Sequence, residues 1–196
     1  MTQILSPIPI NPYSRSGKPL KTVQALVIHW TAAPGQHAAG VVAYYRQRSQ
    51  GKDGYGGAHY AIDLNGDVVA MIPEAEVAYH CGTSQLDPAS GKFYTDAARD
   101  KFGQYAIDYK DLSPNLVTLG IEHCITDALG TMTDETRGAS VELAADICRR
   151  YNLDPVTDLM LHRDVVGWKD CHKWFVDHPD DWQAYKEQVA QAVANA

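Results

Sequence analysis

Apolar residues gather in two continuous runs, each long enough to form a buried strand. They cover residues 23–30 (VQALVIHW) and residues 116–124 (LVTLGIEHC). Runs of this length that are rich in β-branched residues are typical of strands inside a sheet. Further strand signals lie at 58–64, 68–72 and 160–162. Asn65-Gly66 separates the first two of these stretches, and this dipeptide strongly indicates a hairpin turn.

Three stretches instead repeat apolar residues at helical spacing, at 38–48, 133–151 and 179–193. In the first, Val41, Val42 and Tyr45 share one side. Thr133 opens the second as a favoured N-cap residue, and Pro179 suits the first position of the third. Strands and helices therefore alternate, which predicts the α/β class: a single domain with a central mixed β-sheet flanked by α-helices.

The length of 196 residues suits one well-buried domain. Residues 1–20 are punctuated by proline and serine and are expected to be a surface segment before a domain at 21–196. Residues 84–113 combine turn residues with aromatics, and a stretch of this length is usually functional or partly helical. Its aromatic side chains either contact a ligand or hold the segment to the body; they are Phe93, Tyr94, Phe102, Tyr105 and Tyr109.

The formal net charge of −7 argues against a nucleic-acid partner, which would require a basic surface. We expect no membrane insertion, because no apolar stretch is long enough to span a bilayer. The first 16 residues have no apolar core typical of a secretory signal, so synthesis in the cytoplasm is expected. The four cysteines could form two disulfides, but in a reduced setting a cysteine near histidines becomes a candidate metal ligand or nucleophile.

Three residues could form a metal site. His29 ends the first buried run, His162 ends a shorter one, and Cys171 follows in the next turn. Zn²⁺ accepts imidazole and thiolate ligands together, and a catalytic zinc keeps a fourth position open for water. A lone buried histidine is more often a core residue, so the spacing by itself leaves both interpretations open.

Two charged residues could assist such a metal. Glu122 lies within an apolar run, where it faces either a cleft or solvent. In a cleft it could take a proton from water and return it to a leaving amine. Lys169 precedes Cys171 by two positions and could stabilise the oxyanion of a hydrolysed carbonyl, although most loop lysines are simply solvated.

Five stretches together carry a resemblance to a known family. They are 27–32 (VIHWTA), 58–63 (AHYAID), 77–82 (VAYHCG), 119–122 (LGIE) and 162–171 (HRDVVGWKDC). In this order they resemble the amidase-2 family of zinc N-acetylmuramoyl-L-alanine amidases, which includes phage endolysins, muropeptide-recycling amidases and peptidoglycan recognition proteins. The tail after residue 173 is most similar to the endolysin branch.

The resemblance implies a set of site residues. The metal ligands for Zn²⁺ would be His29, His162 and Cys171, and the catalytic pair would be Glu122 and Lys169. The matched motifs also imply three substrate-binding residues, which are His80, Trp30 and Tyr60. Some members of the family have tyrosine where this chain has Ala58, and the family often has proline where this chain has His172. The turn before Cys171 is one residue longer than in many relatives, which makes Asp170 a rival third ligand.

The implied activity is hydrolysis of the amide between N-acetylmuramic acid and L-alanine in bacterial peptidoglycan. The protein would be a monomer without a separate wall-binding domain, made in the cytoplasm and acting on the wall after release. Alternatives are a cytoplasmic recycling amidase, a non-catalytic peptidoglycan-binding protein, and a cysteine hydrolase that pairs Cys171 with His162 or His172.

Overall fold

Six strands of the described residues form one sheet in the order β1-β5-β4-β7-β3-β8. The computed structural model describes residues 3–48, 50–51, 54–108 and 112–195. The strands are β1 (Gln3–Leu5), β3 (Ala25–Trp30), β4 (Tyr60–Ile62), β5 (Val68–Ala70), β7 (Thr118–His123) and β8 (Leu159–Leu161). β4 and β5 are antiparallel and the other pairs are parallel, so the predicted mixed sheet is confirmed.

The two longest strands lie side by side in the middle of this sheet. β3 pairs with β7 along its whole length, and this register places His29 directly beside Glu122. Because strands with neighbours on both edges and both faces must be apolar, these are the two runs that the sequence shows most clearly. The parallel pairing brings the carboxyl ends of β3 and β7 to the same edge of the sheet.

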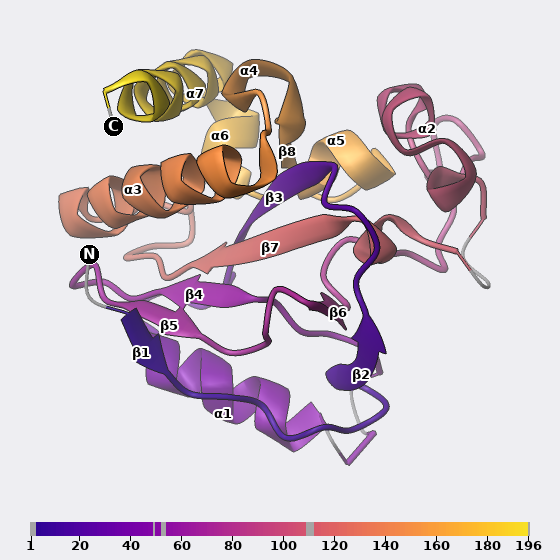
Figure 1. Cartoon of the computed structure of the whole chain (residues 1–196), viewed down its shortest axis with the longest axis horizontal. Helices are drawn as coiled ribbons and strands as arrows, with labels where there is room; N and C mark the ends of the chain where they lie inside the picture. The colour runs from indigo at the N-terminus through magenta and orange to yellow at the C-terminus, as the bar shows by residue number, and fades with distance from the viewer. Residues whose placement is uncertain (1–2, 49, 52–53, 109–111, 196) are drawn as a thin grey trace.

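Helices cover both faces of the sheet (Figure 1). They are α1 (Ala38–Arg48), α2 (Asp96–Phe102), α3 (Asp134–Tyr151), α4 (Pro155–Asp158), α5 (His162–Val166), α6 (Lys173–Asp177) and α7 (Pro179–Ala194). α3 and α7 pack together on one face, over Leu26, Ile28, Leu119 and Ile121. None of the described helices is both long and apolar enough to cross a membrane.

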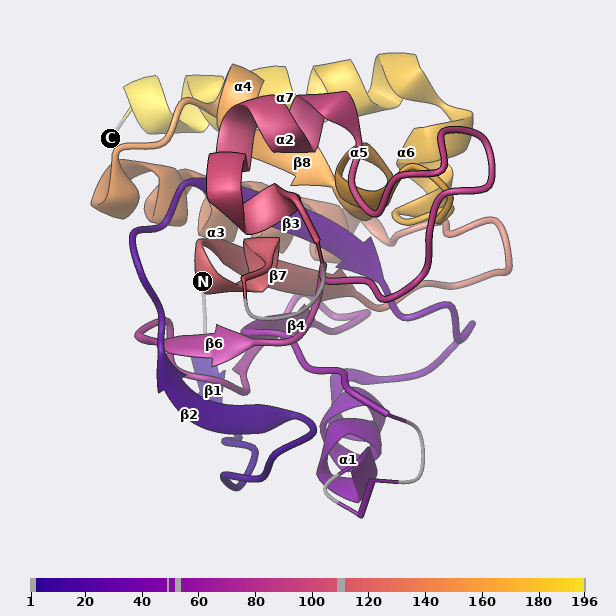
Figure 2. The same cartoon turned by 90° about the vertical axis from the view of Figure 1, so that its right-hand side faces the viewer.

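The opposite face of the sheet is covered by two separate groups of helices. α1 packs over Ala61 and Val69 of β4 and β5. α2 and α5, which lie side by side in Figure 2, pack over Val27 and Met160 of β3 and β8. The alternate residues His29 and Glu122 point to this face, between the two groups.

The N-terminal segment does more than cover the surface. β1 adds an edge strand beside β5, and β2 (Arg15–Pro19) pairs with β6 (Glu76–Ala78) in a small second sheet. Ile8, between these two strands, is fully buried. Short edge strands such as β1 and β2 leave little pattern in a sequence, because one side of each is open to solvent.

Segment 84–113 is partly helical, which was one of the two expectations for a stretch of this length. It contains α2 and a 3-10 turn at Gly103–Ala106, and a second 3-10 turn follows it at Pro114–Leu116. Tyr94 and Phe102 are buried in the core beneath α2, and Phe93 and Tyr105 pack against them. These four aromatics therefore hold the segment to the body; the fifth, Tyr109, lies outside the described residues.

Candidate metal centre and active site

His29, His162 and Cys171 come together in the folded chain. One ligand atom from each lies within 4.8 Å of the others, and all three side chains are buried. His29 is the second-last residue of β3, His162 begins α5 instead of ending a strand, and Cys171 lies in the turn before α6. The Cys171 carbonyl accepts a hydrogen bond from the Arg163 N–H at 2.9 Å, which closes this turn back onto α5.

The turn presents Cys171 to the cluster and directs Asp170 away from it. The Asp170 side chain is 55% exposed and forms an ion pair with Arg163. Asp170 is absent from the group of residues whose ligand atoms converge. The longer turn is therefore compatible with Cys171 as the third metal ligand.

The donor set fits a zinc ion. The Sγ of Cys171 is 3.5 Å from Nδ1 of His29, and Nε2 of His162 is buried without a hydrogen-bond partner. Burial lowers the pKa of both histidines well below the usual range, so their imidazoles are neutral. Burial also raises the pKa of the Cys171 thiol, and the nearby Glu122 adds to this effect. A bound cation would satisfy the unpaired nitrogen and hold the sulfur as thiolate.

Glu122 faces this cluster and not solvent. Its side chain is 9% exposed, and its Oε1 accepts a hydrogen bond from the Tyr45 hydroxyl at 2.9 Å. Its Oε2 is buried without a partner. Burial raises the pKa of Glu122 to about 7, although the Tyr45 hydrogen bond and the Lys169 charge oppose the rise. A carboxyl group with this pKa and one unpaired oxygen is suited to moving protons near neutral pH.

Tyr45 is the residue at this site that the sequence motifs did not indicate. It lies on α1 and is 7% exposed, and its carbonyl accepts a hydrogen bond from the Ser14 hydroxyl at 2.7 Å. Its apolar spacing with Val41 and Val42 predicted burial, but a buried tyrosine also needs a partner for its hydroxyl. The need for a hydrogen-bond partner was therefore the one feature of the sequence that could have drawn attention to Tyr45. In the structure this partner is Glu122.

A cavity of about 410 Å³ opens over the cluster. Its lining includes His29, His162, Cys171, Glu122, Trp30, His80, Tyr45 and Lys169. Lys169 is exposed, and its Nζ lies 5.8 Å from the Trp168 ring centroid. Its positive charge adds to the lowering of the pKa of His29 and partly offsets the rise that burial causes in the pKa of Glu122 and Cys171. The structure thus brings the implied catalytic and metal residues to one cavity.

The three expected substrate-binding residues lie in different places. Trp30 is partly exposed at the cavity, with its ring 6.2 Å from that of His172. His80 reaches the cavity but is 8% exposed, and both ring nitrogens have partners, in His29 and Thr118. Tyr60 packs in the core on the other face of the sheet, and its hydroxyl donates to Glu74 at 2.7 Å. Tyr60 is therefore not placed to bind a substrate in this cavity.

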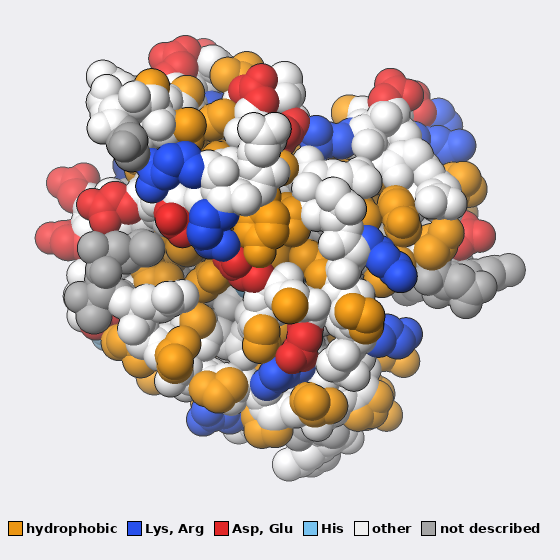
Figure 3. Space-filling view, in the orientation of Figure 1, with side chains coloured by type: hydrophobic (Ala, Val, Ile, Leu, Met, Phe, Trp, Pro, Cys, Tyr) orange, Lys and Arg blue, Asp and Glu red, His pale blue; other side chains and the backbone are white. Residues whose placement is uncertain are grey.

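The other three cysteines, Cys81, Cys124 and Cys148, are buried, and all four are free thiols. Basic and acidic side chains are interspersed over the face of the molecule shown in Figure 3.

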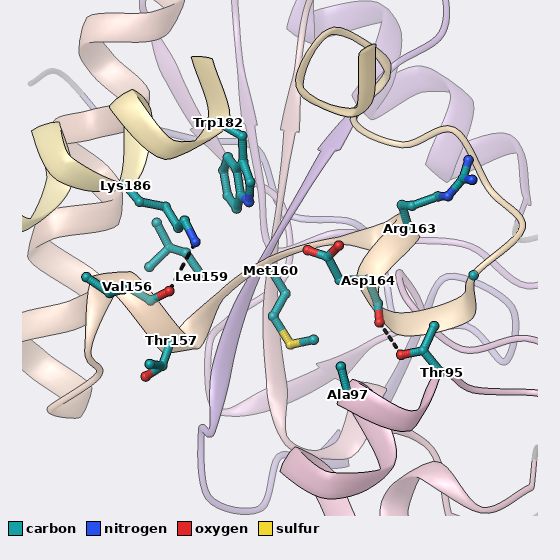
Figure 4. Close-up of a pocket in the computed structure, with 11 residues that line it drawn as sticks. Thr95, Ala97, Val156, Thr157, Leu159, Met160, Arg163, Asp164, Trp182 and Lys186 are labelled. Atoms are coloured by element: carbon teal, nitrogen blue, oxygen red, sulfur yellow. Dashed lines mark hydrogen bonds between the residues drawn. The ribbon is translucent and has the colours of Figure 1, made fainter. Parts of the chain in front are cut away.

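A second pocket, of about 470 Å³, lies between α2, α4, α5 and α7. Figure 4 shows Met160, Trp182 and Lys186 in its lining, with the Lys186 ammonium donating to the Val156 carbonyl at 3.2 Å. Neither Glu122 nor the His–His–Cys cluster takes part in this lining.

Comparisons with known proteins identify the family of this chain. The model of the amidase-2 family, N-acetylmuramoyl-L-alanine amidase, matches residues 19–174. A probable N-acetylmuramoyl-L-alanine amidase of Bacillus licheniformis is 30% identical over 182 residues, which is 93% of this chain and 45% of that protein. The N-acetylmuramoyl-L-alanine amidase BlyA of Bacillus subtilis (strain 168) is 28% identical with the same coverage. The chain thus spans about half the length of these curated relatives.

Solved structures share the fold. A mutant endolysin from Bacillus subtilis superimposes with a TM-score of 0.66 at 18% identity, covering 96% of this chain and 99% of that one. At this identity the likeness supports the architecture alone, and it confirms the predicted α/β fold. Because the family model covers most of the residues, the chain belongs to the amidase-2 family of N-acetylmuramoyl-L-alanine amidases.

Proposed function

We propose that this chain is a zinc-dependent amidase that hydrolyses the bond between N-acetylmuramic acid and L-alanine in peptidoglycan. The observation that supports this most strongly is the buried Glu122 carboxyl, with Oε2 unpaired, beside the His29–His162–Cys171 cluster in one cavity. Its relatives are named for the same activity. Since the chain spans about half of their length, the reaction and substrate are proposed here for this domain.

His29, His162 and Cys171 would hold the ion. When bound, zinc would supply Lewis acidity to the scissile carbonyl and to the attacking water. Glu122 takes the proton of the water on Oε2, because Oε1 already accepts from Tyr45. As the amide C–N bond breaks, Glu122 returns this proton to the leaving amine, so the carboxylate is regenerated.

Lys169 has a different task at the same cavity. Lys169 lines the cavity, and its ammonium would stabilise the negative charge that develops on the carbonyl oxygen during attack. Trp30 lines the cavity, and an aromatic ring there suits contact with a sugar ring or a peptide side chain. We propose that these two residues contact the substrate, while Tyr60 has a structural role.

Product analysis tests the reaction. Purified protein is incubated with peptidoglycan, the released fragments are identified by mass spectrometry, and bound zinc is measured in the same preparation. We expect free stem peptides beginning with L-alanine and about one zinc per chain. The Glu122→Gln variant should keep its zinc and lose about 10²–10⁴-fold in rate, as expected for the loss of a general base. Unchanged hydrolysis by this variant would remove Glu122 from the mechanism.

The substrate form can be resolved with the same assay. A wall lysin would act on the insoluble wall, whereas a recycling amidase would act on soluble muropeptides. Intact sacculi and soluble muropeptides are therefore compared at equal amide concentration. Faster release from sacculi supports a wall lysin, and preference for soluble muropeptides would instead support the recycling amidase.

One observation favours a second candidate, a cysteine hydrolase. The Cys171 sulfur is 3.5 Å from a ring nitrogen of His29, so a thiol–imidazole pair would use His29 and not the expected His162 or His172. Chelation separates the two candidates. EDTA should abolish the hydrolysis by a zinc amidase, and added Zn²⁺ should restore it, whereas a thiol enzyme would keep its activity in EDTA and lose it to iodoacetamide.

A further inference from the structure

We propose that His80 is a positioning residue: a hydrogen-bond relay through Thr118 and His80 holds the proton of His29 on Nε2. The relay leaves Nδ1 of His29 free as its metal-binding atom. The inference rests on the proposed metal site and deepens it. It gives His80 the role of orienting the metal ligand His29, in place of the expected role in binding substrate.

The relay begins at Thr118 on β7. The Thr118 hydroxyl donates its one hydrogen to the Pro114 carbonyl at 2.7 Å. It can therefore act only as an acceptor toward Nε2 of His80, which lies 3.1 Å away. The Thr118 carbonyl, which is 3.4 Å from the same nitrogen, is also only an acceptor. Nε2 of His80 must therefore carry a hydrogen.

The second link joins the two histidines. With the hydrogen on Nε2, the neutral His80 ring has a lone pair on Nδ1, and a second, uncompensated proton in this buried position would be costly. Nδ1 of His80 is 3.0 Å from Nε2 of His29. Nε2 of His29 must then be the donor. The lone pair of His29 is consequently on Nδ1, the atom that lies 3.5 Å from the Cys171 sulfur.

The backbone around His80 holds its ring in this relay. The Asn115 side-chain oxygen accepts hydrogen bonds from the backbone N–H groups of His80 and Cys81, at 3.0 and 2.8 Å. The ring lies directly against Gly120 of β7, where a Cβ would come within 2.6 Å of Cγ of His80. Glycine at this position therefore leaves the room that His80 needs to reach both Thr118 and His29.

Two pairs of variants test the relay. His80→Phe keeps a ring but removes both nitrogens, whereas His80→Asn keeps an acceptor oxygen near the position of Nδ1. Thr118→Val removes the hydroxyl at nearly constant volume, and Thr118→Ser keeps it. Each protein is measured in two ways: zinc affinity by competition with a chelator, and the ¹⁵N chemical shifts of the His29 ring in metal-free protein, which report the tautomer.

In the metal-free parent protein we expect His29 as the Nε2–H tautomer. His80→Phe should mix the two tautomers and weaken zinc binding about 10–100-fold, the usual effect of losing a partner that orients a metal ligand. His80→Asn should keep zinc affinity within a few-fold of the parent. Thr118→Val keeps the Thr118 carbonyl as a longer acceptor, so it should populate the second tautomer only in part, whereas Thr118→Ser should keep the parent tautomer. This pair preserves the test if His80→Phe fails to fold.

Two results would overturn the relay. One is an Nδ1–H tautomer of His29 in the metal-free parent protein. The other is zinc affinity in folded His80→Phe equal to that of the parent. Failure of the proposed function looks different, because a parent protein that binds no zinc would refute the amidase proposal while its His29 tautomer could still be measured.

Discussion

The hydroxyl of Tyr45 offers the most direct test of how Glu122 is tuned. It donates to Oε1 of Glu122 at 2.9 Å, and both side chains are less than one-tenth exposed. Tyr45→Phe removes this donor and little else, since the ring can keep its place on α1. The hydrogen bond favours the charged carboxylate, so its loss should raise the pKa of Glu122 further above the usual range.

The size of the effect follows from the kind of bond. A hydrogen bond to a charged group contributes about 1.5–3 kcal/mol. Part of this remains when the carboxyl is protonated, so about 1.4 kcal/mol of preference for the charged form is a reasonable share. This corresponds to about one pKa unit. A bound metal would lower the pKa of Glu122 in both proteins, so the difference between them is the quantity to measure.

The assay is the pH dependence of peptidoglycan hydrolysis. A protonated Glu122 cannot take a proton from water, so the acid limb of the profile should move about one unit to higher pH in Tyr45→Phe. At high pH, where Glu122 is ionised in both proteins, the rates should agree within a few-fold. Tyr185→Phe is the matched control, because Tyr185 is also a buried tyrosine but bonds to Ser140. Superimposable profiles for Tyr45→Phe and the parent would refute the reasoning.

Four other substitutions have defined expectations. Cys171→Ser should lose zinc because the thiolate is gone, while Asp170→Asn should keep it; metal analysis that shows the reverse would transfer the third ligand to Asp170. Tyr60→Phe should lower the free energy of unfolding by about 1–2 kcal/mol, because it removes a hydrogen bond to a partly buried carboxylate. Urea titration measures this loss, and the lysis assay should show unchanged hydrolysis per folded molecule. A selective loss of activity would instead indicate that Tyr60 contributes to the active site. Burial alone would raise the pKa of Glu74, but its hydrogen bonds from Arg150, Tyr60 and Tyr151 leave it lowered from 4.5. Its contribution to stability is therefore complete above the unfolded pKa and disappears as the pH falls through the lower folded pKa. The deficit in the free energy of unfolding of Glu74→Gln at pH 7 should therefore shrink as the pH falls below 4.5. A deficit independent of pH would mean that this charge contributes nothing.

The sequence by itself determined the class of fold and supplied the candidate site residues. β3 and β7 are buried on all sides, so their apolar runs are continuous, and α1, α3 and α7 repeat apolar residues at the helical period. These are local patterns, and they are readable without knowledge of what packs against them. The ordered motifs added the family, and with it the pair His29 and Glu122 at the ends of neighbouring strands.

The tertiary structure decided what depends on contacts between distant segments. Strand alternation puts Tyr60 and Ala61 on opposite faces, but only the packing of α3 and α7 shows that Tyr60 faces the core. Tyr45 reaches Glu122 across 77 positions of the chain, a distance over which local pattern carries no information. The geometry of one turn, closed by a backbone hydrogen bond onto Arg163, places Cys171 instead of Asp170 beside the two histidines.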